Sequence, residues 1–216
     1  MQQPSTFHYV IHYEKTSAVW QLSELFVQHI PFDHEQLIFC CIGTDRSTGD
    51  ALGPLVGNHL TQDYAFPFTV LGTLEKPVHA LNLLETQAEL ETRTPYPFII
   101  AVDACLGEED SIGSIIVRDG SLYPGRAVKK ELPPIGNLSI KGVVNVGGFM
   151  EAMVLQNTRL HITHSMSTTI ARALTLAWQR HLLKNKQYRN DYANYRNPRQ
   201  QIGYSNFRSA CNTKPN

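Results

Sequence analysis

The chain contains little cysteine, and its cysteines form no metal or dithiol motif. The four are Cys40, Cys41, Cys105 and Cys211, and no two are separated by two residues. This spacing argues against a C-x-x-C zinc site or redox pair. Cys40 and Cys41 are adjacent in an apolar run, so on a strand they would point to opposite faces. We interpret the cysteines as small buried thiols of a protein from a reducing compartment.

Net charge and long apolar runs are also absent. The chain has 19 basic and 19 acidic side chains, and its formal net charge is zero. This balance gives no general electrostatic reason to bind nucleic acid or a membrane surface. No run approaches the roughly 18 apolar residues of a membrane span. The first five residues, Met-Gln-Gln-Pro-Ser, include no basic segment followed by an apolar stretch, so we expect no signal peptide and a cytoplasmic location.

Short apolar blocks alternate with helical patterns through the first half of the chain. Helices are expected at 19–30, 51–64 and 79–92, the last with Leu81, Leu84 and Ala88 on one face; buried strands are expected at 37–42, 68–71 and 98–102. This order predicts right-handed crossovers and a parallel sheet. The fold class is therefore α/β: a three-layer sandwich with a mostly parallel central sheet and helices on both faces.

The second half continues the same architecture. Strands are expected at 115–117, 143–146 and 160–162, helices at 149–156 and from about Ser167 onward, and a loop at 120–142. Residues 1–188 then form a single domain. Residues 189–216 are rich in Asn, Arg and Gln without apolar periodicity, which predicts a mobile basic tail.

One segment, Gly43-Thr-Asp-Arg-Ser-Thr-Gly-Asp-Ala-Leu-Gly-Pro54, joins a buried strand to a helix. In an open parallel sheet, ligands bind at such carboxyl ends of strands. The segment lacks the Gly-Lys-Ser/Thr ending of a P-loop, and its two aspartates make it a poor anion cradle. Asp50 just before the helix has two interpretations: an N-cap whose carboxylate accepts backbone N–H groups, or a chemically active group facing a cleft.

Asp103 directly follows the predicted strand 98–102. If strand 37–42 lies between strands 68–71 and 98–102, Asp50 and Asp103 face each other at a topological switch point. Two close carboxylates do not both ionise readily, so one keeps a proton near neutrality. Such a pair can activate a water and polarise an amide carbonyl. It can alternatively bind a divalent metal with a histidine as third ligand.

The segment from Gly43 to Pro54 resembles the first-strand loop of the germination protease of spore-forming bacteria. Similarity continues at Ile100-Ala-Val-Asp-Ala104 and at Gly113–Val117 with Tyr123-Pro-Gly125, where tyrosine replaces the histidine of the relatives, and more weakly through Val143–Glu151. The chain is most similar to a short sporulation protein family related to that protease. The resemblance covers roughly residues 37–185.

This resemblance implies a phosphorylase/hydrolase-like fold, shared with hydrogenase maturation peptidases, and an aspartic-type peptidase (a hydrolase) with Asp50 and Asp103 as the catalytic pair. The neighbouring loop residues are expected to bind substrate: Asp45, Arg46, Ser47 and Thr48. The implied substrate is a protein or peptide, including small spore proteins, in the mother cell or forespore. No cofactor is expected, and a homo-oligomer is compatible with the sequence.

Other chemistries remain open at this point. The maturation peptidases add a histidine to their acidic pair, and His164 is the candidate third group here, although His161 and His164 also suit a structural role. Cys105 with His164 would make a nucleophile pair, and Ser165 or Ser167 most simply caps the last helix. A non-catalytic binding or regulatory protein on a peptidase-like scaffold is the alternative function.

Overall fold

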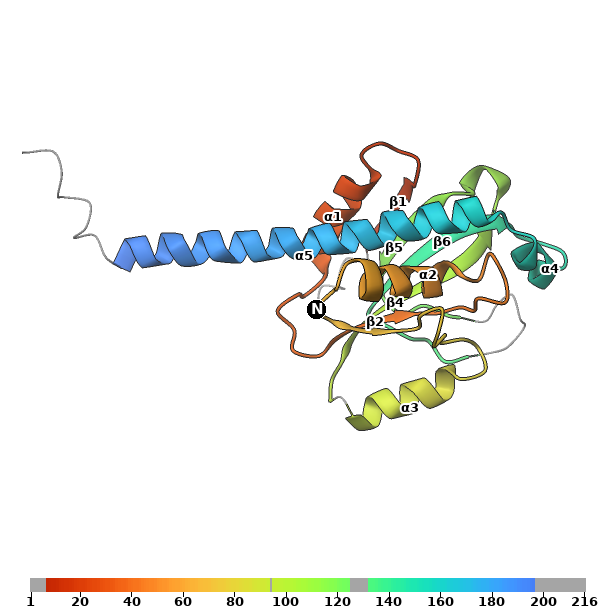
Figure 1. Cartoon of the computed structure of the whole chain (residues 1–216), viewed down its shortest axis with the longest axis horizontal. Helices are drawn as coiled ribbons and strands as arrows, with labels where there is room; N and C mark the ends of the chain where they lie inside the picture. The colour runs from red at the N-terminus through yellow and green to blue at the C-terminus, as the bar shows by residue number, and fades with distance from the viewer. Residues whose placement is uncertain (1–6, 94, 125–131, 197–216) are drawn as a thin grey trace, which may run out of the picture. The chain divides into compact units, whose positions relative to one another are not determined.

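The computed structural model describes residues 7–93, 95–124 and 132–196 (Figure 1). Two compact units are distinguished along the chain, residues 1–178 and 179–216, and the sheet and its site belong to the first. Strands in chain order are β1 (His8–His12), β2 (Leu37–Cys41), β3 (Thr69–Leu71), β4 (Phe98–Gly107), β5 (Ser114–Asp119) and β6 (Leu138–Val146). Helices are α1 (Ala18–His29), α2 (Leu52–Asn58), α3 (Leu83–Arg93), α4 (Glu151–Gln156) and α5 (Leu160–Arg196). A π-helical turn, His59–Asp63, extends α2, and a 3₁₀ turn, Glu109–Ser111, precedes β5.

The six strands form one mixed sheet in the order β1-β5-β6-β4-β2-β3. Pairs β2–β3, β2–β4 and β4–β6 are parallel, whereas β5 pairs antiparallel with both β1 and β6. The predicted placement of β2 between β3 and β4 is confirmed. After β2 the chain crosses to β3, and after β4 it leaves toward β5 on the other side. The switch point between β2 and β4 therefore exists.

The two faces of the sheet are covered unequally. One face carries the main core, in which α1, α2 and residues 160–178 of α5 pack on alternate strand residues such as Phe39, Ile100 and Ile140. The opposite face carries a smaller core around Leu83 of α3 and Ala101 of β4. Figure 1 shows α3 on the side of the sheet away from α1, α2 and α5. The three-layer α/β fold is thus observed, with one thick and one thin helical layer.

Several sequence expectations need correction. Residues 160–162 are not a strand but the first residues of α5, which begins before the predicted start near Ser167. Strand β6 begins at Leu138, so the predicted loop 120–142 ends earlier than expected. β1 was not predicted. On the segment around α3, Leu81 and Leu84 are exposed, and the buried contacts come from Leu83 and Leu90 instead.

The predicted tail is only partly described. α5 continues as a helix through residues 189–196, and residues 197–216 lie outside the described part of the chain. Within the described residues, no helix is both long and apolar enough to cross a bilayer.

Candidate active site

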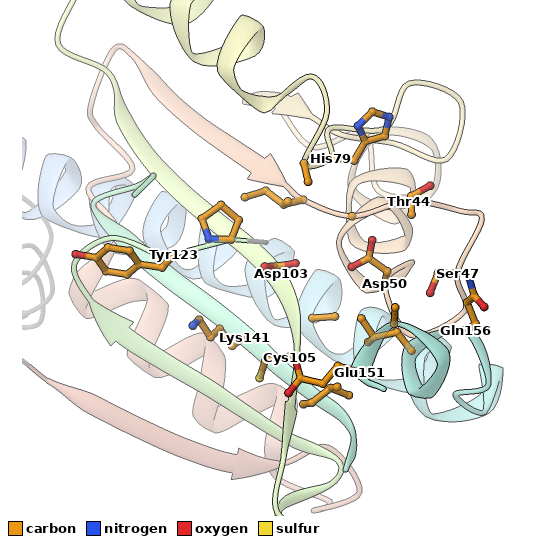
Figure 2. Close-up of a pocket in the computed structure, with 18 of the residues that line it drawn as sticks. Thr44, Ser47, Asp50, His79, Asp103, Cys105, Tyr123, Lys141, Glu151 and Gln156 are labelled. Carbon is orange, nitrogen blue, oxygen red and sulfur yellow. The ribbon is translucent and has the colours of Figure 1, made fainter. Parts of the chain in front are cut away.

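A cavity of about 590 Å³ opens on the thinly covered face, at the carboxyl ends of β2 and β4. Its floor is the sheet itself: Asp103 and Cys105 of β4, Lys141 of β6, and Ile116 and Arg118 of β5 alternate with residues that point into the main core. The rim comes from the loop after β2, from α4 and from the segment before α3, as Figure 2 shows.

Two glycines allow the loop after β2 to fold back against its own strand. Gly43 has a φ of +141°, and a side-chain carbon there would lie 1.9 Å from the Asp50 carbonyl oxygen. The Thr44 N–H donates to that same carbonyl at 3.1 Å. Gly53 brings α2 onto β2, where an added carbon would lie 2.1 Å from the Ile42 carbonyl oxygen. The loop is thereby closed, and Asp50 is held beside the end of β2.

Asp50 does not serve as the helix cap. Ala51 is the residue before α2, and no side chain makes a capping hydrogen bond there. The Asp50 carboxyl instead lines the cavity. Burial raises its pKa, while a backbone hydrogen bond from Thr44 and the charge of His79 oppose that rise. The helix therefore leaves this carboxyl available to a ligand.

Asp103 is the more strongly perturbed member of the pair. It is 8% exposed, and burial together with the negative charge of Asp50 raises its pKa well above the usual range. Lys141 and the Ala104 N–H act in the opposite direction. Both carboxyls line the same cavity, in which the charge of Asp50 acts on Asp103. Burial raises the pKa of both carboxyls, and it favours the protonated form more strongly at Asp103 than at Asp50.

The predicted substrate-binding residues separate into two groups. Arg46 and Ser47 line the cavity, whereas Asp45 and Thr48 do not. The Ser47 hydroxyl is buried and has no hydrogen-bond partner among the described residues. Asp45 is exposed and accepts a hydrogen bond from the Thr44 hydroxyl at 3.4 Å. Ser47 thus lines the cavity with a hydroxyl that is itself buried and has no partner among the described residues.

Further functional groups reach the cavity that the sequence did not single out. His79 precedes α3, Lys141 lies within β6, and Glu151 begins α4. Tyr123, which replaces the histidine expected from the resemblance, lines the cavity with Pro124. Gly125 falls outside the described residues.

The predicted third group, His164, is not part of this cavity. Its ring packs edge-on against His59 at a centroid distance of 5.6 Å. His59 in turn contacts Asp63, four residues later on the π-helical turn. The nucleophile pair of Cys105 with His164 is accordingly absent. Ser165 and Ser167 lie inside α5 rather than at its start, and the Ser167 hydroxyl donates to the His164 carbonyl at 2.8 Å.

Cys105 is predicted to be unreactive at neutral pH. Burial raises its pKa to about 11, which leaves little of the nucleophilic thiolate. We expect iodoacetamide to label Cys105 in the native chain roughly a hundred times more slowly at pH 7.5 than an unperturbed thiol. Peptide mass spectrometry between pH 7 and 10.5 measures this rate. Rapid labelling at pH 7 would reinstate the thiol as a nucleophile.

Across the described parts of the chain, no three His, Cys, Asp or Glu side chains come together in a way that would hold a metal ion. The cavity does combine two carboxyls with His79, whose charge lowers the pKa of Asp50. The arrangement supplies a proton donor, a proton acceptor and cationic groups within one space, which suits general acid–base chemistry.

Comparison with known proteins places the chain in a family. A family profile described as "Protein of unknown function (DUF1256)" matches residues 10–173. A Bacillus subtilis (strain 168) relative, described as uncharacterized protein YyaC, is 51% identical over 140 residues, which are 65% of this chain and 68% of the relative. The crystal structure of a [NiFe] hydrogenase maturation protease, HycI from Thermococcus kodakarensis KOD1, matches 71% of this chain and 98% of its own at 18% identity and a TM-score of 0.37.

The family profile spans the whole sheet apart from the first two residues of β1, and it includes both Asp50 and Asp103. The chain belongs to the DUF1256 family.

Proposed function

We propose that this protein is a peptidase that cleaves a protein or peptide substrate with the Asp50/Asp103 pair. The observation that carries the proposal is the approach of two carboxyls, one of them buried, in a single open cavity at the switch point of the sheet. Perturbed acid pairs in clefts are typical of working sites. Neither carboxyl is needed as a helix cap, so a structural role does not account for their placement.

The proposed reaction uses the pair in opposite protonation states. Asp50, as carboxylate, takes a proton from a water molecule whose oxygen attacks the peptide carbonyl carbon. Asp103, as carboxylic acid, donates a hydrogen bond to the carbonyl oxygen and then gives its proton to the leaving nitrogen. The C–N bond breaks, and the products are a carboxylic acid and an amine. A proton returns from Asp50 to Asp103 through solvent to complete the cycle.

The cavity is suited to an extended peptide. Its volume of about 590 Å³ lies within the range of ligand sites. Thr44 and Ser47 of the loop after β2 line the cavity beside Asp50. Arg46 at the exposed rim offers a cation to a substrate carbonyl or carboxylate.

The biological setting of the proposal rests on the resemblance to the germination protease. The segment Gly43–Pro54 carries most of that resemblance, and it supplies Asp50 and the rim of the cavity. We infer a sporulation-associated role in a spore-forming bacterium, with small spore proteins as the first substrates to test. A cytoplasmic site of action, in the mother cell or the forespore, belongs to the same inference.

The test is a search for defined fragments. Purified protein is incubated with extracts of sporulating cells and with purified small spore proteins, in parallel with Asp50→Asn and with excess chelator, and products are identified by mass spectrometry. We expect specific fragments from the wild type in both the presence and the absence of chelator, and none from Asp50→Asn.

Two other outcomes would change the conclusion. Loss of fragments with chelator would indicate that the carboxyls act through a metal ion. If neither the wild type nor the variant yields fragments between pH 4 and 9, a binding or regulatory protein on the same scaffold is favoured.

A further inference from the structure

Lys141 lies beside Asp103 on the floor of the cavity. The two residues are paired in the parallel register between β4 and β6, so their side chains leave the sheet on the same face. On the other side of β6, Lys141 pairs with Ile116 of β5, an uncharged neighbour. Figure 2 shows Lys141 between Tyr123 and Cys105, below Asp103. A cation on β6 therefore lies directly next to the buried carboxyl on the neighbouring strand, β4.

This lysine has no evident structural task. Its two neighbours in β6, Ile140 and Gly142, are an apolar residue and a glycine. Within the described residues, the Lys141 ammonium takes part in no ion pair. A half-buried cation facing a cavity costs solvation free energy unless a charge or a ligand compensates for it. Asp103 and whatever binds in the cavity are the compensating groups available.

We propose that Lys141 is a third functional group of the site, which stabilises the negative charge that appears on the Asp103 side of the cavity during bond cleavage. This inference rests on the proposed peptidase function and adds a residue to it. Negative charge appears there twice: on the carbonyl oxygen as water attacks, and on Asp103 once its proton has gone to the leaving nitrogen. A fixed ammonium group stabilises both without reorganising.

The electrostatics of the neighbouring groups agree with this role. Lys141 lowers the pKa of Asp103 and that of Cys105, against the effect of burial on each. The ammonium therefore acts on its register partner Asp103 and on Cys105, two residues further along β4. Without it, Asp103 would bind its proton more tightly and would be a poorer proton donor.

Other ionisable groups share the cavity and contribute to the same field. They are His8 of β1, Arg46 of the loop after β2, Cys105 of β4, Arg118 of β5, His79 before α3, Tyr123, and Glu151 of α4, in addition to Asp50. Of these, Asp50 raises the pKa of Asp103. Among the cations of the described residues, Lys141 is the one that lowers the pKa of Asp103.

The kinetic test compares Lys141→Met, which keeps the length but removes the charge, with Lys141→Arg. We expect Lys141→Met to lower kcat about a hundred-fold with little change in KM, and its pH optimum to move upward. Lys141→Arg should keep the wild-type optimum and recover part of kcat. Lys76→Met is the matched control, because Lys76 is exposed and outside the cavity, and it should behave as wild type.

A second measurement does not need substrate. In protein labelled with ¹³C at the aspartate carboxyls, the Asp103 signal is identified by its absence in Asp103→Asn, and its titration midpoint is recorded. We expect that midpoint to rise by about one pH unit or more in Lys141→Met and to stay near the wild-type value in Lys141→Arg.

These two measurements separate the proposals. If the wild type cleaves nothing, the peptidase assignment fails while the titration still decides whether Lys141 stabilises charge on Asp103. If the wild type cleaves and Lys141→Met keeps both its kcat and its pH optimum, the role of Lys141 is refuted and the acid pair stands. An unchanged Asp103 midpoint in Lys141→Met likewise overturns the inference.

Discussion

Replacement of Asp103 by asparagine is expected to lower the rate of peptide cleavage about a thousand-fold or more. Asparagine keeps the shape of the protonated carboxyl and donates a hydrogen bond, but it has no proton to give to the leaving nitrogen. Substrate binding should change little, so the loss should appear in kcat rather than in KM. Steady-state assays on the substrate identified from fragment analysis measure both constants.

Asp119→Asn provides the matched control for this variant. Asp119 ends β5, is exposed and does not line the cavity, so the same chemical change there should leave activity intact. If Asp103→Asn retained more than a tenth of the wild-type kcat, the acid-pair mechanism would be untenable.

Asp103→Asn should also be more stable than the wild type at neutral pH. Because the folded chain raises the pKa of Asp103, the folded state keeps this proton to a higher pH than the unfolded chain does. The contribution of Asp103 to wild-type stability is thus fully present below the unfolded pKa, about 3.9, and is lost as pH rises through the folded value. Asparagine does not titrate, so its stabilising effect should be absent near pH 4 and grow toward pH 7.5. Denaturant unfolding at several pH values measures it, and a variant less stable at pH 7.5 would contradict this sign.

Gly53→Ala is expected to be among the most destabilising single substitutions of a small residue in this chain. The added carbon would lie 2.1 Å from the Ile42 carbonyl oxygen, and a backbone atom cannot move aside as a flexible side chain can. α2 must then shift away from β2, at a cost of about 3 kcal/mol, the upper end for overpacking. This corresponds to a fall in Tm of about 6–12 °C for a chain of this size.

Gly147→Ala is the control, since its nearest neighbour would be the Leu106 Cβ at 3.4 Å, an ordinary contact. Calorimetry or thermal circular dichroism compares the two variants. A Gly53→Ala protein that melts within 2 °C of Gly147→Ala would show that α2 can adjust freely, and that the loop holding Asp50 is less tightly fixed than described.

The central part of the fold was predictable because its strands are buried on both faces. β2 and β4 appear in the sequence as continuous apolar blocks, and the order of strands and helices between β2 and β4 determined which strands are neighbours. The approach of Asp50 to Asp103 followed from that order. β1 was not predicted: it is an edge strand in which polar histidines flank a few apolar residues.

The start of α5 was misread because two of its buried positions are polar. Thr163 and Ser167 are fully buried on the same helical face as Met166 and Ile170. A search for apolar periodicity passes over these two hydroxyl residues, so only the later part of the helix is visible. Ser167 is tolerated there because its hydroxyl bonds to the His164 carbonyl one turn earlier.

Lys141 could not be found from the sequence for a related reason. Lys141 and Gly142 interrupt the apolar residues of β6. The sequence therefore predicted a strand only at 143–146, and the part of β6 before it was assigned to a loop. Only the pairing of β6 with β4 shows that Lys141 and Asp103 are neighbours, because 37 residues separate them in the sequence. His79 was hidden in the same way, because it reaches the cavity from an irregular segment.

The unequal covering of the sheet has a consequence for how this protein can diverge. The residues that hold α1, α2 and α5 in place lie on one face, and nearly all side chains of the cavity floor lie on the other. Since side chains alternate along each strand, a substitution at a floor position leaves its two main-core neighbours untouched. Relatives can therefore acquire new ligand preferences through substitutions on the cavity face of the sheet while the main core on the other face stays unchanged. A library confined to the floor positions is the natural starting point for changing the ligand preference of this scaffold.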